Sequence, residues 1–170
     1  MPRTVILAAM LLLSLAPVAA GAADKADAAT GTFTEGLAAY ERGDHAAALE
    51  LFRPAAAEGN AAAQYYLGMA YENGDGVAQD YAAATKWYRE AAEQGSAQAQ
   101  YRLGALYEYG KGVSQDYERA FMWFDLSSVS GKYFGVTRRE LVAKKMTREQ
   151  IDDAKKMEQD CREHHLSGCG

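Results

Sequence analysis

The chain repeats itself with a period of 36 residues. When the sequence is displaced by 36 positions, residues 61–89 align with residues 97–125, and identities recur along the whole overlap. These identities are spread over the unit and include Leu67 with Leu103, Tyr71 with Tyr107, and Trp87 with Trp123. A unit this short cannot bury an apolar face alone, so the repeat predicts units stacked side by side rather than one globular core.

Each full unit has the pattern of two helices joined by a turn. The apolar residues of its first half fall at helical spacing, and so do those of its second half. In residues 61–96 these two stripes are Ala63, Leu67, Ala70 and Tyr71, and then Tyr81, Ala84, Tyr88 and Ala91, with Trp87 flanking the second stripe. The many alanines and few β-branched residues also favour helix over strand. We therefore predict an all-α fold.

Glycine and aspartate mark the ends of these helices. Two glycines end the first helix of each unit and let the chain turn, and an aspartate follows at the N-cap position of the second helix. The residues are Gly74, Gly76 and Asp80 in one unit and Gly110, Gly112 and Asp116 in the next. Gly68 and Gly104 instead lie inside the first helix, where glycine costs about 1 kcal/mol relative to alanine. Their recurrence predicts a neighbouring helix too close for a Cβ.

The repeats predict a right-handed α-α superhelix, a solenoid of helix-turn-helix units with a helical cap. We expect a degenerate first repeat over residues 32–60, full repeats over 61–96 and 97–132, and capping helices over 133–170. Two capping-box patterns, Thr137 with Glu140 and Thr147 with Gln150, predict where the capping helices begin. In the second of these helices, one apolar edge faces the last repeat and is formed by Ile151, Ala154, Met157 and Cys161.

The N-terminus has the three-part organisation of a secretory signal. Arg3 precedes an apolar run over residues 5–15, and small residues follow up to Ala22 and Ala23, where cleavage is expected. We predict a signal peptide over residues 1–23, a flexible segment over 24–31, and a periplasmic or secreted protein. The apolar run is shorter than the roughly 20 residues of a spanning helix, so no transmembrane span is expected in the mature chain. An uncleaved N-terminal anchor is the alternative.

The pattern of glycine, tyrosine and alanine resembles the tetratricopeptide repeat. The 36-residue period and the loop Gly-x-Gly-Val-x-x-Asp-Tyr are similar to those of its relative, the Sel-one-like repeat, strongly over residues 61–131 and weakly before them. This resemblance implies a non-enzymatic adaptor, scaffold or regulator that binds a protein or peptide without a cofactor. Exported bacterial members are frequently periplasmic. We expect a monomer, with self-association through an uncapped repeat edge as the alternative.

The resemblance also places the partner-binding surface on the concave side, which the first helices line. Carried onto this chain, the groove positions are Tyr65, Met69, Glu72, Asn73, Tyr101, Glu108 and Tyr109. Tyrosine suits a binding surface because it combines a large contact area with a polar tip. The alternative for Tyr65 and Tyr101 is a packing role at a half-buried position.

Charge and residue types exclude several functions. The net charge of −5 is spread along the chain and leaves no basic stripe for nucleic acid. The three histidines are His45, His164 and His165, and no serine lies in a Gly-x-Ser-x-Gly elbow, so we expect no catalytic site. Glu72 and Glu108 recur with the repeat, which fits surface positions better than the acid and base of a glycosidase. An envelope hydrolase, or a glycan- or peptidoglycan-binding protein using the same groove, is the alternative.

Cys161 and Cys169 are the two cysteines of the chain. In an oxidising compartment we expect them to form a disulfide, worth about 2–3 kcal/mol for so short a loop. A zinc site formed by Cys161, His164, His165 and Cys169 is the alternative. Their spacing does not match the usual paired zinc ligands, so we expect no bound metal.

Overall fold

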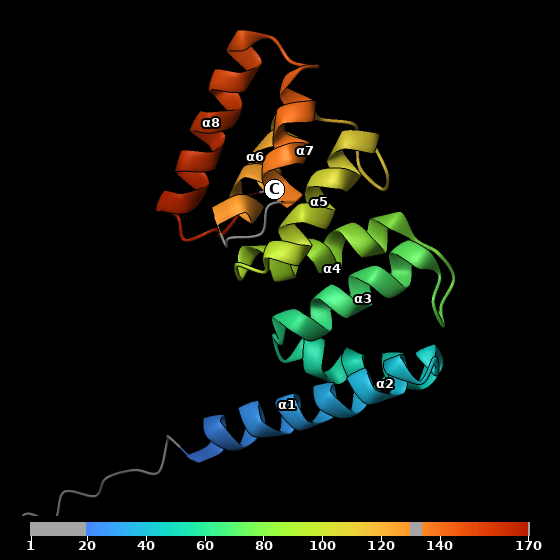
Figure 1. The fold of residues 1–170 in the computed structure, drawn as a ribbon. Helices are drawn as coiled ribbons and strands as arrows, with labels where there is room; N and C mark the ends of the chain where they lie inside the picture. The colour runs from blue at the N-terminus through green and yellow to red at the C-terminus, as the bar shows by residue number, and fades with distance from the viewer. Residues whose placement is uncertain (1–19, 130–133, 170) are drawn as a thin grey trace, which may run out of the picture.

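The computed structural model describes residues 20–129 and 134–169, which form eight α-helices and no strand. Consecutive helices pair into antiparallel hairpins, and the hairpins stack one on another (Figure 1). This arrangement confirms the all-α solenoid. The helices are α1 (Ala20–Glu41), α2 (His45–Ala57), α3 (Ala61–Asn73), α4 (Tyr81–Glu93), α5 (Ala97–Tyr109), α6 (Tyr117–Val129), α7 (Phe134–Ala143) and α8 (Arg148–Glu163).

The structure tests only part of what the sequence predicts for the N-terminus. Residues 1–19, which hold most of the proposed signal peptide, lie outside the described residues. Residues 24–31 were expected to be flexible, but they belong to α1. The alanines of this segment favour helix, and the helix continues without a break into the first hairpin. None of the helices among the described residues is long and apolar enough to cross a membrane.

The two helices of each hairpin approach closely at a glycine. A Cβ at Gly68 in α3 would lie 2.5 Å from the Tyr88 ring of α4. A Cβ at Gly104 in α5 would lie 3.0 Å from the Phe124 ring of α6. The predicted close approach is therefore confirmed, and an aromatic ring occupies the space that each glycine leaves.

The predicted caps are also present. The Asp80 side chain accepts hydrogen bonds from the backbone N–H groups of Ala82 and Ala83, at 2.9 and 3.0 Å. Asp116 accepts one from the N–H of Arg119 at 2.9 Å. At the other boundary, Gly74 and Gly110 end α3 and α5 in the left-handed conformation. The sequence motif thus marks the ends of the helices correctly.

The loop of each full repeat also reaches back to the preceding hairpin. Gly112 has a φ of +71°, and a Cβ there would lie 2.3 Å from the backbone carbon of Tyr81 at the start of α4. Gly76 meets the start of α2 in the same way, 2.8 Å from the backbone carbon of His45. These glycines join neighbouring repeats as well as turning the chain. In the first unit, Gly43 meets no described atom within 4 Å, and its loop is shorter.

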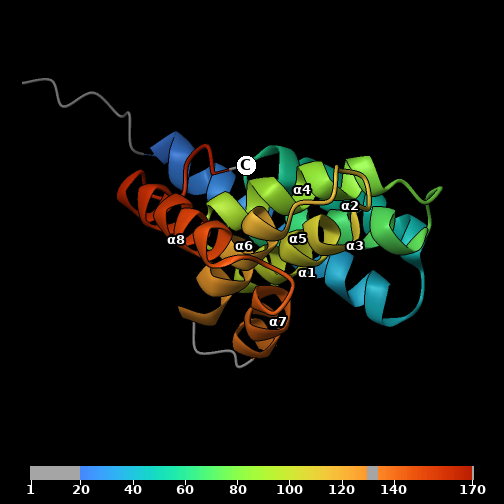
Figure 2. The same ribbon diagram turned by 90° about the horizontal axis from the view of Figure 1, so that it is seen from above.

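The C-terminal helices follow two different courses. α7 packs against α6 as α5 packs against α4, whereas α8 turns back and lies along α6 (Figures 1 and 2). The capping box of Thr147 and Gln150 is confirmed at the start of α8. The other capping-box prediction is wrong, because α7 begins at Phe134 and Thr137 lies inside the helix.

The inner face of α8 is the predicted apolar edge. Ala154 and Cys161 are buried, and Ile151 and Met157 pack against the same core cluster. Cys161, in the last turns of α8, forms a disulfide with Cys169 beyond the end of the helix, with 5.3 Å between their Cα atoms. The disulfide occupies both sulfurs that the alternative zinc site required. The described residues contain no group of three or more metal-ligating side chains.

Candidate functional site

A groove of about 490 Å³ lies beside the first helices of the two full repeats. Its walls come from α3, from the N-terminal half of α5, and from the ends of α6 and α7 that face each other. We call it the Tyr-Arg groove, and it is lined by Tyr65, Ala97, Gln98, Tyr101, Arg102, Ser127 and Gly135. Of the seven residues predicted to bind a partner, Tyr65 and Tyr101 belong to this lining.

Both tyrosines combine packing with exposure to the groove. The Tyr65 ring lies 5.9 Å from the Tyr88 ring, and the Tyr101 ring lies 5.4 Å from the Phe124 ring, measured between centroids. Each is half-buried over the aromatic side chain that fills the glycine gap of its own hairpin. The two alternatives from the sequence therefore coexist, because a ring held by packing also lines the groove.

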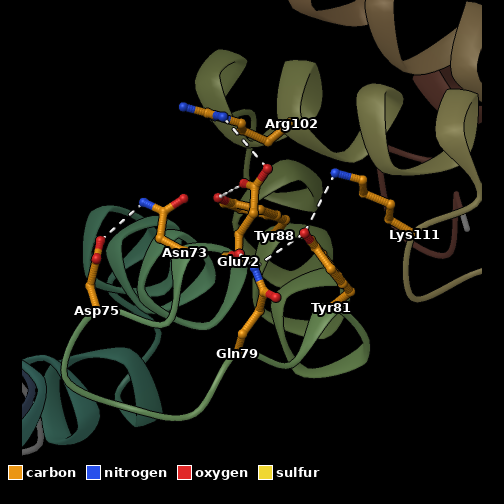
Figure 3. Close-up of polar contacts among 8 residues, drawn as sticks. All are labelled: Glu72, Asn73, Asp75, Gln79, Tyr81, Tyr88, Arg102 and Lys111. Atoms are coloured by element: carbon orange, nitrogen blue, oxygen red, sulfur yellow. Dashed lines mark hydrogen bonds and ion pairs between the residues drawn. The ribbon is translucent and has the colours of Figure 1, made fainter.

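A polar network that includes Arg102 of the groove joins the two full repeats (Figure 3). The hydroxyl of Tyr88 donates to Oε2 of Glu72 at 2.6 Å, and Arg102 of the next repeat lies 3.6 Å from Oε1 of Glu72. Arg102 also interacts with the hydroxyl of Tyr65. Burial disfavours the charge on Arg102, but Glu72, Tyr88 and Tyr65 outweigh it and raise the pKa of the guanidinium. Burial, followed by the charge of Glu72, raises the pKa of Tyr88.

Glu108 repeats this network one period later, but deep in the protein. Arg138 of α7 lies 3.6 Å from Oε2 of Glu108, and Lys145 donates to its Oε1 at 3.0 Å. The hydrogen bond with Glu108 raises the pKa of Lys145. Only 2% of Glu108 is exposed, so the prediction that it is an accessible groove residue is wrong. The extra helix α7, which covers the end of α5, is what buries it.

The two networks differ by one hydroxyl. Tyr88 supplies the hydrogen bond to Glu72, whereas Phe124 stands at the equivalent place in the next repeat. Oε2 of Glu108 consequently has no hydrogen-bond partner among the described residues. Lys145, from the turn between α7 and α8, compensates by binding the other carboxylate oxygen.

The remaining predicted residues lie away from the groove lining. Met69 is half-buried and packs against the core cluster that extends from α4 to α8. Asn73 donates to Asp75 at 3.0 Å at the end of α3. Tyr109 is 52% exposed at the end of α5, where its hydroxyl accepts from Arg138 at 2.7 Å. Arg138 also interacts with Tyr101, so Tyr109 is linked to the groove through this arginine.

Sequence reasoning missed Arg102 and Arg138, which join successive units. They are 36 residues apart, so the repeat itself could have revealed them, but Arg138 lies where the other identities have ended. At the first junction the ring of Tyr40 contacts that of Tyr66 instead, with 5.4 Å between centroids. An aromatic contact there replaces the ion pair of the later junctions.

A second cavity, of about 410 Å³, lies between α6 and the end of α8. Arg119 and Met122 of α6 form one wall, and the disulfide with the residues around it forms the other. The side chain of Arg119 is already paired with Asp116 at 2.7 Å. This cavity lies where the last full repeat meets the C-terminal cap.

Comparison with known proteins places the repeats in a family. The family model of the Sel1 repeat matches residues 33–60, 61–96 and 97–128, which together exceed half of the chain. No curated protein sequence matches the chain.

Two solved structures share the fold. A protective antigen of uropathogenic Escherichia coli strains with an SLR fold is 39% identical, with a TM-score of 0.77 over 83% of this chain and 31% of that protein. A Sel1 repeat protein from Oxalobacter formigenes is 32% identical, with a TM-score of 0.59 over 61% of this chain and 41% of that protein. The chain thus spans less than half the length of either structure. With three matched repeats and this shared solenoid, the chain belongs to the Sel1 repeat family.

Proposed function

We propose that the chain is a non-enzymatic protein- or peptide-binding module that acts as an adaptor, scaffold or regulator in the bacterial periplasm or cell envelope. The observation that carries this proposal is the Tyr-Arg groove, an open surface built from residues of successive repeats. Its two tyrosine rings are held in place by packing, so a guest would gain contact area at little cost in side-chain entropy.

The carboxylates support binding rather than catalysis. Glu108 is 2% exposed and is engaged by Lys145, so it has no route to a substrate in the groove. Glu72 accepts the Tyr88 hydroxyl and faces Arg102. A pair of accessible carboxylates, as glycoside hydrolysis requires, would need at least one of these groups to leave its partners.

The disulfide supports export. Disulfides persist in oxidising compartments such as the periplasm and are rare in the cytosol. The bridge between Cys161 and Cys169 therefore agrees with the secretory signal proposed for residues 1–23. Edman sequencing of the protein recovered from the periplasmic fraction tests this point, and an N-terminus at Met1 would contradict processing.

A capture experiment tests the binding surface. The mature protein, fixed to a resin, is exposed to periplasmic extract, and the retained proteins are identified by mass spectrometry. We expect Tyr101→Ala to reduce capture of the specific partner, because its ring lines the groove, while circular dichroism shows that the helices persist. Tyr109→Ala, on the same helix but outside the groove lining, tests whether the binding surface extends to the end of α5. Equal capture by all three proteins would refute the assignment of the surface.

Catalysis is tested separately. The purified protein is incubated with peptidoglycan fragments and with a chromogenic β-lactam, and products are followed by chromatography and absorbance. We expect no turnover. Turnover that is lost in Glu72→Gln would instead establish an envelope hydrolase.

A further inference from the structure

We propose that the Tyr-Arg groove recognises its peptide ligand through a carboxylate, which binds the guanidinium of Arg102 in the groove that Tyr65 and Tyr101 also line. This inference rests on the proposed peptide-binding function and specifies the chemistry of the guest. The occupant is a peptide segment that presents either an Asp or Glu side chain or a free C-terminus.

The charge of the lining points to an anionic guest. Among the seven described residues that line the groove, Arg102 carries the one ionised side chain, and the others are phenols, an amide, a hydroxyl and small residues. The chain as a whole has a net charge of −5, so an arginine as the one ionised side chain among these lining residues stands out against an acidic protein. A buried or half-buried cation attracts an oppositely charged group more strongly than a fully solvated one.

Arg102 is held in position and still has donors to offer. Its nearest guanidinium nitrogen is 3.6 Å from Glu72, beyond ordinary hydrogen-bond length, and a second contact goes to Tyr65. A guanidinium carries five N–H donors in a planar fork, so these contacts leave donors for a guest. Figure 3 shows Glu72 contacting Arg102 from one side, with the far nitrogen directed away from it. The side chain is 40% exposed, which makes it reachable.

Glu72 orients Arg102 more than it competes with a guest. Its other oxygen accepts the Tyr88 hydroxyl at 2.6 Å, and its side chain is 19% exposed. A guest carboxylate approaching from the groove meets the outer edge of the guanidinium, where an Arg-carboxylate pair can form two parallel hydrogen bonds. Fixing the arginine beforehand lowers the entropy that binding would otherwise cost.

The shape of the groove agrees with a short peptide segment. A volume of about 490 Å³ is within the usual range of ligand clefts. Gln98, at an exposed position of α5, offers its amide to a peptide backbone. The rings of Tyr65 and Tyr101 line the same groove as Arg102 and can cover the apolar part of an acidic side chain.

The test uses the full mature protein and an array of immobilised 12-residue peptides of randomised sequence. One arm has amidated C-termini with internal Asp or Glu, a second has free C-termini without acidic side chains, and a third has neither. We expect the wild type to retain peptides from the first or second arm at least tenfold more strongly than those from the third. Which of the two arms prevails identifies the source of the carboxylate.

Two variants assign the preference to Arg102. Arg102→Gln should lower the retention of carboxylate peptides at least tenfold. Gln98→Glu is a second variant on an exposed position of α5, and it places a glutamate four residues before Arg102, where it can pair with the guanidinium. It should lower retention without affecting folding. Arg148→Gln makes the same charge change as Arg102→Gln at an exposed position on α8, and should retain the wild-type preference.

The outcomes separate this inference from the function on which it rests. Peptides retained without any carboxylate preference, or a preference that survives both Arg102→Gln and Gln98→Glu, would overturn the carboxylate site and leave the peptide-binding function standing. Retention of no peptide by the folded wild type would overturn both.

Discussion

Glu108 and Arg138 lie 3.6 Å apart, the same separation as Glu72 and Arg102 one repeat earlier. α7 therefore stands where the first helix of a fourth repeat would stand, and the chain folds as three hairpins and the beginning of another. The sequence of α7 has lost most of the repeat pattern but has kept the arginine that joins one unit to the next. The same carboxylate network makes specific predictions about stability.

Replacing Tyr88 by Phe should lower the free energy of unfolding by about 1–2 kcal/mol, because Glu72 loses a charge-assisted hydrogen bond but remains partly hydrated. Urea unfolding followed by circular dichroism measures the change. Tyr66→Phe is the control, since no described residue hydrogen-bonds to the Tyr66 hydroxyl and its ring remains packed. A loss as large for Tyr66→Phe as for Tyr88→Phe would contradict this explanation.

The reverse change, Phe124→Tyr, should stabilise the protein by about 1 kcal/mol. The new hydroxyl would reach the carboxylate oxygen of Glu108 that has no hydrogen-bond partner among the described residues, as Tyr88 does for Glu72. A double-mutant cycle with Glu108→Gln isolates the interaction. The gain should shrink when Glu108 is neutralised, and a destabilised Phe124→Tyr would show that the core has no room for the hydroxyl.

Tyr88 should ionise later than the exposed tyrosines in an alkaline titration. Burial and then Glu72 raise its pKa above the ordinary value of 10.0, so the native state holds this proton more tightly than the unfolded chain does. Its contribution to stability is therefore complete below about pH 10 and is lost as the pH rises further. Absorbance at 295 nm should show a late phase that coincides with unfolding. That phase should be absent in Tyr88→Phe, and its persistence there would assign it to another tyrosine.

Alanine at the two hairpin glycines should have unequal effects. At Gly68 a Cβ would lie 2.5 Å from the Tyr88 ring, so we expect a loss of about 1–3 kcal/mol despite the better helix propensity of alanine. At Gly104 the nearest ring atom is 3.0 Å away, and a smaller shift of Phe124 suffices. Thermal unfolding of the two variants provides the comparison. Gly104→Ala should be the more stable variant, and the opposite order would mean that the rings do not set the spacing.

Removal of the disulfide, in a variant with Cys161→Ser and Cys169→Ser, should cost about 2–3 kcal/mol. The bridge holds a tail in which His165 and Leu166 have positive φ and Leu166 packs against the repeat core. Dithiothreitol should lower the melting temperature of the wild type and leave that of the double variant unchanged. Hydrogen exchange should increase mainly in α8, whereas an increase spread over α3 and α4 would indicate a wider role.

The fold could be predicted from the sequence because its determinants are local and recur. Gly68 and Gly104 repeat at a fixed distance, as do Asp80 and Asp116, and each pair has one physical role that the structure shows twice. The start of α7 could not be placed in the same way, because a Thr137-Glu140 pair has the residue types of a capping box without lying at a helix end.

The site was harder to predict because it depends on distances between units. Tyr65 and Tyr101 could be placed beside the groove from their register on the first helix. The burial of Glu108 could not, because it depends on α7, whose residues no longer match the repeat. The packing of α8 along α6 likewise depends on tertiary contacts, and the repeat pattern of the sequence does not indicate them.

The backward reach of the repeat loops limits how such a chain can change in length. Gly112 packs closely against the backbone of Tyr81. Losing or gaining one loop residue would therefore move the glycine away from this contact and put a residue with a side chain in its place. A whole 36-residue unit contains its own loop glycine, and it also contains the helix start against which the loop glycine of the next unit packs. Duplication or deletion of complete units should therefore be tolerated where single-residue indels are not, so that the protein lengthens in steps rather than continuously.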